Sequence, residues 1–196
     1  MRPIELSDVK NIYEYEKIRN DNRTSIIAEK KNRRVALGPN MTFIFENRNT
    51  VLFQIQEMLR TERIITDEGM QSEVDVYNAL IPGDSELSAT LLVEITDKDQ
   101  IRPILDSLVG LGHNSIFLVI GEHEIPAIFD EAQSSVDRIS AVQYLRWQLN
   151  ETDVEQMRSS QAPVTMISRH KNYAYSTTLT NEQRASLLAD LSEVLA

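Results

Sequence analysis

The sequence of 196 residues predicts a single α+β domain in which a helical N-terminal part packs on an antiparallel or mixed sheet. Apolar residues make up 41% and charged residues 26% of the chain, as in ordinary globular domains, so a packed core is expected. Segments with a helical period concentrate at about 1–80, and short apolar runs separated by Gly, Pro and Asp fill about 86–196. No internal repeat or Pro/Gly/Ser-rich linker divides the chain, so one domain over 1–196 is expected.

The first half should contain four helices and a strand. The expected helices lie at about 8–18, 22–34, 50–63 and 67–79. Ser7 can cap the first helix, and Gly38-Pro39-Asn40 ends the second. In MTFIFEN, residues 41–47, the side chains of Met, Phe and Phe alternate with those of Thr, Ile and Glu. That alternation is the period of a half-buried strand.

The second half follows a turn signal at 81–84, Ile-Pro-Gly-Asp, and should be rich in strands. The expected strands lie at about 88–95, 115–121, 124–129, 140–150 and 165–170. The expected helices lie near 98–109, from Asn150 or Thr152 to about 160, and at 181–195.

The helix at 50–63 has two contrasting faces. At 100° per residue, one stripe is apolar and predicts core contact: Val51, Leu52, Ile55, Met58 and Leu59. The opposite side mixes polar and apolar residues: Phe53, Gln56, Glu57, Arg60 and Ile64. Glu57 and Arg60 are three residues apart, so they can form an ion pair on the helix surface. This side is therefore either a helix surface with paired charges or the lining of a site.

Glu62 falls within the apolar stripe of the same helix, where an unpaired carboxylate is costly. Glu62 can pair with another group, or the helix has already ended at this residue, or Glu62 is buried and unpaired and becomes a candidate acid or base.

Arginines outside this helix are the next candidates for binding. In the strand at 140–150, Arg146 shares a face with Tyr144 and Gln148, and such an arginine can hold a carboxylate or phosphate bidentately or lie on a solvated sheet face. The cluster Lys30-Lys31-Asn32-Arg33-Arg34 can bind a phosphate or an acidic partner, with Arg34 as a candidate ligand-binding residue. It equally suits the solvated end of a helix.

Composition excludes several classes of function. With no cysteine, the chain cannot form disulfides, thiol nucleophiles or cysteine-ligated clusters. A formal charge of −10 argues against binding nucleic acid or an anionic membrane. Even so, residues 1–64 carry 12 Lys/Arg against 9 Asp/Glu, which leaves one part mildly basic. No signal peptide or long apolar segment is present, so a cytoplasmic, soluble protein is expected.

No motif identifies a reaction or a cofactor. The six glycines form no phosphate-binding loop, and no Gly-x-Ser-x-Gly elbow occurs. His113 lies in a glycine-rich loop, and His170 lies among basic residues. His123, between Glu122 and Glu124, is a weak candidate for a metal ligand, and no metal site is otherwise indicated.

Several runs of residues resemble an uncharacterised bacterial family, domain of unknown function 3501. The runs are RRVALGP at 33–39, FENR at 45–48, QIQEMLR at 54–60, ER at 62–63, YNALIP at 77–82, LSATLLVE at 87–94 and LRW at 145–147. The resemblance covers about 8–150. Members of this family are often encoded beside rubrerythrin-like ferritin-fold proteins and iron–sulfur oxidoreductases, which implies a redox or oxidative-stress setting.

Two hypotheses follow. The first is an accessory protein that binds a rubrerythrin-like or iron–sulfur partner through its acidic body or the basic 30–34 edge. The second is a non-thiol enzyme or anion-binding protein in which Glu57 is the acid or base and arginines clamp the substrate. The residues expected to line that concave site are Gln54, Gln56, Glu57, Arg60, Tyr77 and Arg146.

Overall fold

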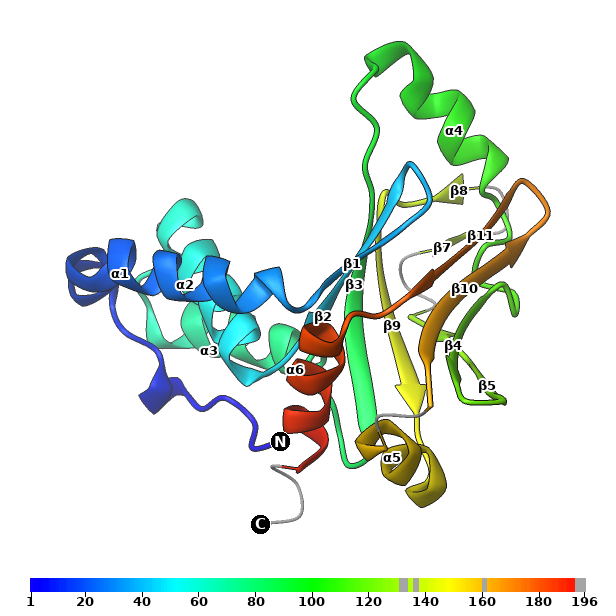
Figure 1. The fold of residues 1–196 in the computed structure, drawn as a ribbon. Helices are drawn as coiled ribbons and strands as arrows, with labels where there is room; N and C mark the ends of the chain where they lie inside the picture. The colour runs from blue at the N-terminus through cyan, green and yellow to red at the C-terminus, as the bar shows by residue number, and fades with distance from the viewer. Residues whose placement is uncertain (131–133, 136–137, 160–161, 193–196) are drawn as a thin grey trace.

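Two antiparallel β-sheets form the body of the molecule, and three N-terminal helices extend from one of them in the computed structural model (Figure 1). The structure describes residues 1–130, 134–135, 138–159 and 162–192. The helices are η1 (Leu6–Asp8), α1 (Ile12–Lys31), α2 (Arg48–Glu62), α3 (Asp67–Asn78), η2 (Lys98–Gln100), α4 (Ile101–Ser107), α5 (Glu151–Arg158) and α6 (Asn181–Ser192). The strands are β1 (Arg34–Leu37), β2 (Met41–Glu46), β3 (Glu86–Val93), β4 (Ile116–Ile120), β5 (His123–Pro126), β6 (Ile128–Phe129), β7 (Ser134–Ser135), β8 (Arg138–Ile139), β9 (Val142–Gln148), β10 (Val164–His170) and β11 (Tyr173–Thr178).

The large sheet has the strand order β1-β2-β3-β9-β6, and the small sheet has the order β11-β10-β4-β5. Each pairing in both sheets is antiparallel. Strands β7 and β8 pair with each other in a third, two-stranded sheet. The chain is therefore a single α+β domain with antiparallel sheets, as predicted.

The main core lies between the inner faces of the two sheets. Alternation along β2 and β9 turns Phe43, Phe45 and Trp147 inward, and the Phe45 and Trp147 ring centroids are 5.6 Å apart. Tyr173 joins β11 of the small sheet to the β1–β2 hairpin. Its hydroxyl donates to the Leu37 carbonyl at 2.7 Å and accepts from the Asn40 and Met41 amides at 2.8 and 3.0 Å.

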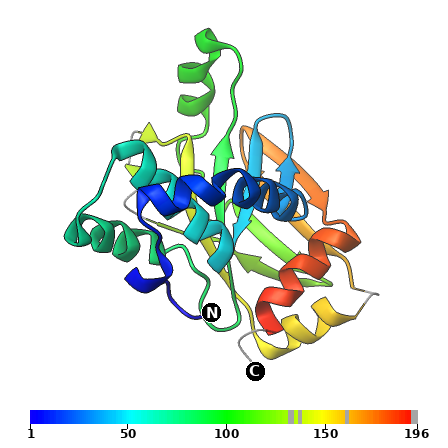
Figure 2. The same ribbon diagram turned by 90° about the vertical axis from the view of Figure 1, so that its left-hand side faces the viewer.

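The helical part has a smaller core of its own beside the outer face of the large sheet (Figure 2). Its buried members are Ile4, Val51, Ile55, Leu59, Val74, Leu80 and Ile81, and the β9 residue Tyr144 packs against them. The apolar stripe predicted for α2 is therefore a core stripe, although Leu52 and Met58 are only half-buried. Among the described residues, no helix combines the length and apolar character needed to cross a bilayer.

The N-terminal boundaries differ from those expected. A single helix, α1, replaces the two predicted at 8–18 and 22–34, because Asn20-Asp21-Asn22 contains no glycine or proline that would break it. Its N-cap is Asn11, whose side chain accepts from the Glu14 amide, and not Ser7. Strand β1 begins at Arg34, where the helix was expected to end. Strand β11 was not predicted at all.

Candidate functional site

A cavity of about 270 Å³ lies where the outer face of the large sheet meets the connection between α3 and β3. We call it the sheet pocket. Its lining residues are Ala79, Leu80, Ser88, Ile128, Phe129, Asp130, Tyr144, Leu145 and Arg146. Alternation along β9 turns Leu145 and Trp147 toward the main core, so Tyr144 and Arg146 lie on the opposite, outer face. The pocket thus joins apolar walls to a few polar groups, the usual composition of a small-molecule site.

Arg146 lies at one wall of the sheet pocket and already has protein partners. Its Nη1 donates to Glu86 Oε1 on the neighbouring strand, and its Nη2 contacts the Ala79 carbonyl oxygen at the end of α3. Its side chain is 34% exposed, whereas the Glu86 side chain is 14% exposed. The guanidinium therefore ties β9 to β3 and α3, and its charge is largely balanced by Glu86.

Two tyrosines lie in and beside the sheet pocket. Burial raises the pKa of Tyr144, and the negative charges of Glu46 and Asp130 raise it further. Burial also raises the pKa of Tyr77, which packs against the same small core and interacts with Tyr144. Both phenols therefore keep their protons at neutral pH, and a hydroxyl in this state is able to donate a hydrogen bond.

Glu46 is a buried carboxylate close to Tyr144. It is 2% exposed, and it accepts hydrogen bonds from the Thr50 hydroxyl at 2.5 Å and the Thr90 hydroxyl at 2.7 Å. Within the described part of the chain, no lysine, arginine or histidine forms an ion pair with it. The β2 alternation placed Glu46 on the face with Thr42 and Ile44, but it did not show that α2 would cover that face.

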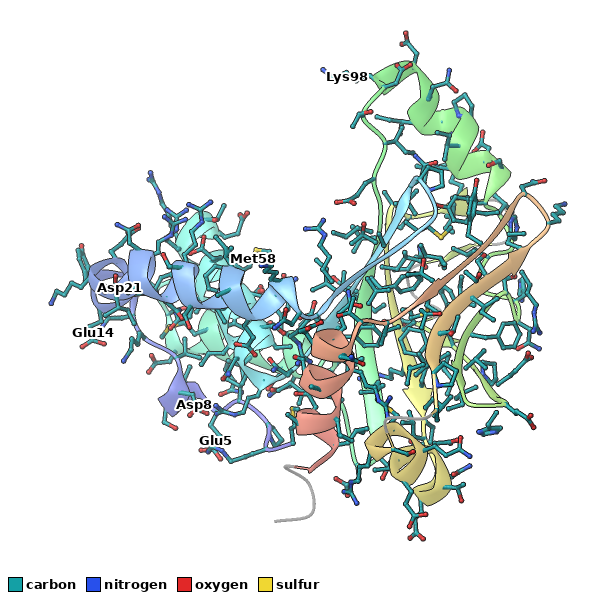
Figure 3. The ribbon with its side chains drawn as sticks, in the orientation of Figure 1. Glu5, Asp8, Glu14, Asp21, Met58 and Lys98 are labelled. Atoms are coloured by element: carbon teal, nitrogen blue, oxygen red, sulfur yellow. The ribbon has the colours of Figure 1, made fainter. Side chains whose placement is uncertain are left out.

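The polar residues of α2 lie elsewhere, against α1 and the N-terminal segment. Gln56 is 4% exposed. Its Oε1 accepts from the Lys10 amide at 2.8 Å, and its Nε2 donates to the Lys10 carbonyl at 3.0 Å. A hollow of about 440 Å³ borders this contact and includes Asp8, Asp21 and Gln56 in its lining. We call it the helix hollow. Figure 3 shows Asp8 and Asp21 on the helical part, away from the sheets.

Glu57 is the centre of an ion-pair network between α1 and α2. Its Oε1 accepts from the Tyr15 hydroxyl and from Arg19 Nε, both at 2.8 Å, and its Oε2 accepts from Arg19 Nη2 at 2.8 Å. Arg60 Nε lies 3.8 Å from the same carboxylate, and Arg60 Nη1 donates to Glu16. The pairing with Arg19 lowers the pKa of Glu57, so the carboxylate is ionised at neutral pH and has no proton to donate.

The remaining carboxylate and arginine candidates do not lie at the sheet pocket. Glu62 is the last residue of α2 and is exposed, so the apolar stripe has ended before it. Arg34 is half-exposed and donates to Glu94 at 2.6 Å. Gln54 is half-buried on α2, with its Oε1 buried and without a hydrogen-bond partner among the described atoms. Of the six residues expected to share one site, Arg146 lines the sheet pocket, Tyr77 lies beside it, and Gln56, Glu57 and Arg60 face α1 instead.

The three histidines have different surroundings. His113 is exposed on a turn, and His170 is buried, with its Nε2 3.2 Å from the Val109 carbonyl. His123 places Nδ1 2.6 Å from Asp153 Oδ1. Among the described residues, no three His, Asp or Glu side chains are grouped so that they could hold a metal ion.

The fold and the pocket define a protein of two antiparallel sheets with a helical layer on one outer face. The family described as Protein of unknown function (DUF3501) matches residues 3–191, so this chain belongs to that family, as its sequence runs indicated. The chain is also similar to a solved structure, a protein of unknown function from Burkholderia pseudomallei K96243. That similarity has 31% identity and a TM-score of 0.90 and covers 97% of this chain and 100% of the other. No curated protein matches the sequence.

Proposed function

We propose that this DUF3501 protein is a binding protein that holds a small ligand in the sheet pocket. The observation that carries this proposal is the combination of a cavity of about 270 Å³ with apolar walls from Leu80, Ile128 and Tyr144 and a charged rim. A cavity of this size suits a small molecule rather than a nucleotide. The walls belong to strands and to a helix end, so the site is largely formed before a ligand binds.

The charges around the sheet pocket favour a cationic ligand over the anionic one expected from Arg146 alone. Glu86 neutralises Arg146, and Glu46 and Asp130 both act on Tyr144. Three carboxylates against one guanidinium leave the local field negative, and such a field attracts cations. The ring of Tyr144 supplies a face on which an ammonium group is also attracted.

The test is a matched pair of probes, benzylammonium and benzoate, titrated calorimetrically into the purified protein. We expect benzylammonium to bind with a dissociation constant on the order of 1 mM, about −4 kcal/mol, and benzoate to bind at least tenfold more weakly. Asp130→Asn should weaken benzylammonium binding about threefold to tenfold, because one nearby charge is removed. Glu62→Gln removes an equal charge from an exposed helix end and serves as the control, with no change expected.

Two results would contradict this proposal. If the protein preferred benzoate, the sheet pocket would be an anion-binding site, as first expected from Arg146. Failure of both probes to bind would remove the sheet pocket as a site for small aromatic ligands.

A second candidate function is docking to a protein partner in a redox setting, such as a rubrerythrin-like or iron–sulfur protein. The outer face of α1 favours it, because Tyr13 is 84% exposed and Ile27 is 59% exposed on a helix that buries only Tyr15 and Ile26. Tyr13 and Ile27 are 14 positions apart, so they lie about 21 Å apart along the helix and within about 40° of each other around it. Glu16, Lys17, Asn20 and Thr24 lie between them on this side, and two exposed apolar side chains within a polar surface suit the contact face of a transient partner.

Docking can be tested with a purified rubrerythrin-like protein from the same organism. Its binding to the chain should be measurable by calorimetry and should be weakened at least tenfold in the double variant Tyr13→Ser/Ile27→Ser. The exposed Ile65→Ser, on the α2–α3 connection, is the control of similar exposure. Equal loss in both variants, or no binding by the unmodified chain, would rule out α1 as the docking face for that partner.

A further inference from the structure

A second site lies beside the small sheet, where the start of β5 contacts the first turn of α5 (Figure 1). An open hollow of about 590 Å³ is lined there by Gly121, Glu122, His123, Gln156, Ser159 and Ala162. We call it the α5 hollow. It shares no lining residue with the sheet pocket, so it is a separate feature of the molecule.

The histidine in the α5 hollow is held by a buried carboxylate. Asp153 Oδ1 lies 2.6 Å from His123 Nδ1, and Asp153 Oδ2 accepts from the Asn150 amide at 2.9 Å. The side chain of Asp153 is 2% exposed, whereas that of His123 is 53% exposed. A carboxylate only accepts hydrogen bonds, so this contact places a proton on Nδ1 and leaves the lone pair of the neutral ring on Nε2.

Nε2 lies on the side of the ring away from Asp153, and none of the described residues hydrogen-bonds it. The imidazole therefore has one nitrogen fixed by the protein and the other free to act on a bound molecule. In general-base catalysis a buried carboxylate commonly orients the histidine that accepts the proton, and Asp153 holds His123 in this way.

Gln156 also lines the α5 hollow, but its side-chain oxygen is packed inside the protein. Its Oε1 is buried and has no hydrogen-bond partner in the described structure, although buried acceptors are nearly always paired. The same oxygen lies 2.7 Å from the position that a Cβ would occupy on Gly121, so it sits against the β4–β5 turn. Arg184 donates to the carbonyl oxygens of Gln156, Met157 and Ala162 and so fixes the end of α5.

We propose that His123 and Asp153 form a proton-accepting dyad, in which Asp153 positions the imidazole and Nε2 takes a proton from a hydroxyl or amine group bound in the α5 hollow. The proton moves from the ligand oxygen or nitrogen to Nε2, and Asp153 balances the positive charge of the resulting imidazolium. The ligand class is therefore a small molecule that carries a hydroxyl or amine group.

The first test is the tautomer of His123, read from long-range ¹H–¹⁵N spectra of the protein near neutral pH. We expect His123 to carry its proton on Nδ1 and to leave Nε2 unprotonated, and Asp153→Asn should change the ratio of tautomers. A neutral His123 ring with its proton on Nε2 in the unmodified protein would overturn the proposal, and this measurement needs no variant.

The second test uses 4-nitrophenyl acetate as a probe of Nε2 reactivity. Nε2 attacks the ester carbonyl carbon, 4-nitrophenolate leaves, and water cleaves the acetylimidazole to acetate. His123→Gln, which leaves the Asp153 contact with Asn150 in place, should lower hydrolysis by the protein about tenfold, and Asp153→Asn should also lower it. His113→Gln removes an exposed histidine without a carboxylate partner and should change the rate little.

Comparison of the two histidines decides the outcome. If His113→Gln and His123→Gln lower hydrolysis equally, or if Asp153→Asn reacts like the unmodified protein, the His123–Asp153 contact is only a structural link between β5 and α5. Circular dichroism of each variant distinguishes loss of the dyad from loss of the fold.

Discussion

The sheet body and the helical part of this protein are held together in different ways. The sheets enclose a large apolar core that extends from Val35 on β1 to Val164 on β10. The helical part has only seven buried apolar residues in its own core, and its contacts with α1 and with the N-terminal segment are largely polar. Gln56 binds the Lys10 backbone, and Glu57 binds Tyr15 and Arg19.

This difference explains why the α2 side chains resembled a site. A helix that contacts a second helix through hydrogen bonds and ion pairs presents the same Gln, Glu and Arg residues as one that lines a pocket. In this chain those groups bind other parts of the protein, and the sheet pocket is formed by residues of β9, β6 and the end of α3. Polar residues on a helix face therefore indicate a contact, but they do not show whether the contact is a ligand or another helix.

The largest effect is expected where the sheet body is linked to α6. Arg33 is 1% exposed, donates to the carbonyls of Phe45 and Glu46 at 2.8 and 3.0 Å, and pairs with buried Asp190. Arg33→Ala removes the guanidinium from a buried carboxylate, so it should lower the free energy of unfolding by about 3–5 kcal/mol in urea titrations. The adjacent Arg34→Ala breaks a half-exposed pair and should cost about 1 kcal/mol at most. Equal losses would show that the buried pair does not link these elements.

A smaller loss is expected at the β1–β2 hairpin. Gly38 has φ +66°, and a Cβ there would lie 2.7 Å from the Tyr175 ring and 2.8 Å from the Tyr173 hydroxyl. Gly38→Ala should therefore lower the melting temperature through about 2 kcal/mol of combined backbone strain and crowding. Gly110→Ala, at φ +92° with no atom within 4 Å of its Cβ, reports the backbone strain alone. A similar melting temperature for the two variants would mean that the tyrosine contact contributes nothing.

In the helical part, Gln56→Ala removes the two hydrogen bonds to Lys10 and should cost about 1–2 kcal/mol. The loss should be local, so amide hydrogen exchange at Lys10 is the measurement, and faster exchange there is expected. Gln54→Ala is the matched control, because Gln54 makes no such contact with Lys10. Unchanged exchange at Lys10 in Gln56→Ala would show that the N-terminal segment is held by other groups.

The smallest effect concerns the Glu57 pair and depends on pH. The folded-state pKa of Glu57 is below its ordinary value of 4.5, so its stabilisation is present above about pH 4.5 and is lost as pH falls through the lowered pKa. Glu57→Gln should therefore cost about 1 kcal/mol at neutral pH, since the pair is partly exposed, and progressively less in acid. Glu62→Gln, measured over the same pH range, should differ from the unmodified protein by less than about 0.5 kcal/mol. A constant difference at every pH would exclude the ion pair as its source.

The sequence predicted the fold class and most sheet strands, because β2 has the alternation of a strand and β3, β4 and β9 are short apolar runs between turn residues. It did not predict β11, whose residues are mostly exposed and which Tyr173 ties to the β1–β2 hairpin through tertiary hydrogen bonds. It also divided α1 at Asn20-Asp21-Asn22, where polar composition alone does not break a helix. The position of β11 depends on contacts between distant segments, which local patterns do not contain.

The candidate site was predictable only in part. Arg146 and Tyr144 were correctly placed on one strand face, because the strand period is short and regular. The groups that complete the sheet pocket come from Leu80 and Phe129 on other elements, and the partners of Glu57 come from α1. Neither these pocket residues nor the partners of Glu57 can be predicted from the periodicity of one helix or strand. The helical projection of α2 alone therefore could not distinguish a structural contact from a ligand site.

The central claim is that the sheet pocket binds ligand and that the α2 polar face is structural. The most direct measurement is the site of benzylammonium binding, mapped by chemical-shift changes in ¹³C-labelled methyl and aromatic groups. We predict the largest changes at Ile128, Phe129 and Tyr144, with Tyr15 and Leu52 at the helix hollow unchanged. Changes at Tyr15 and Leu52 with none at the sheet pocket would contradict the account and would place the bound ligand at the contact between α1 and α2.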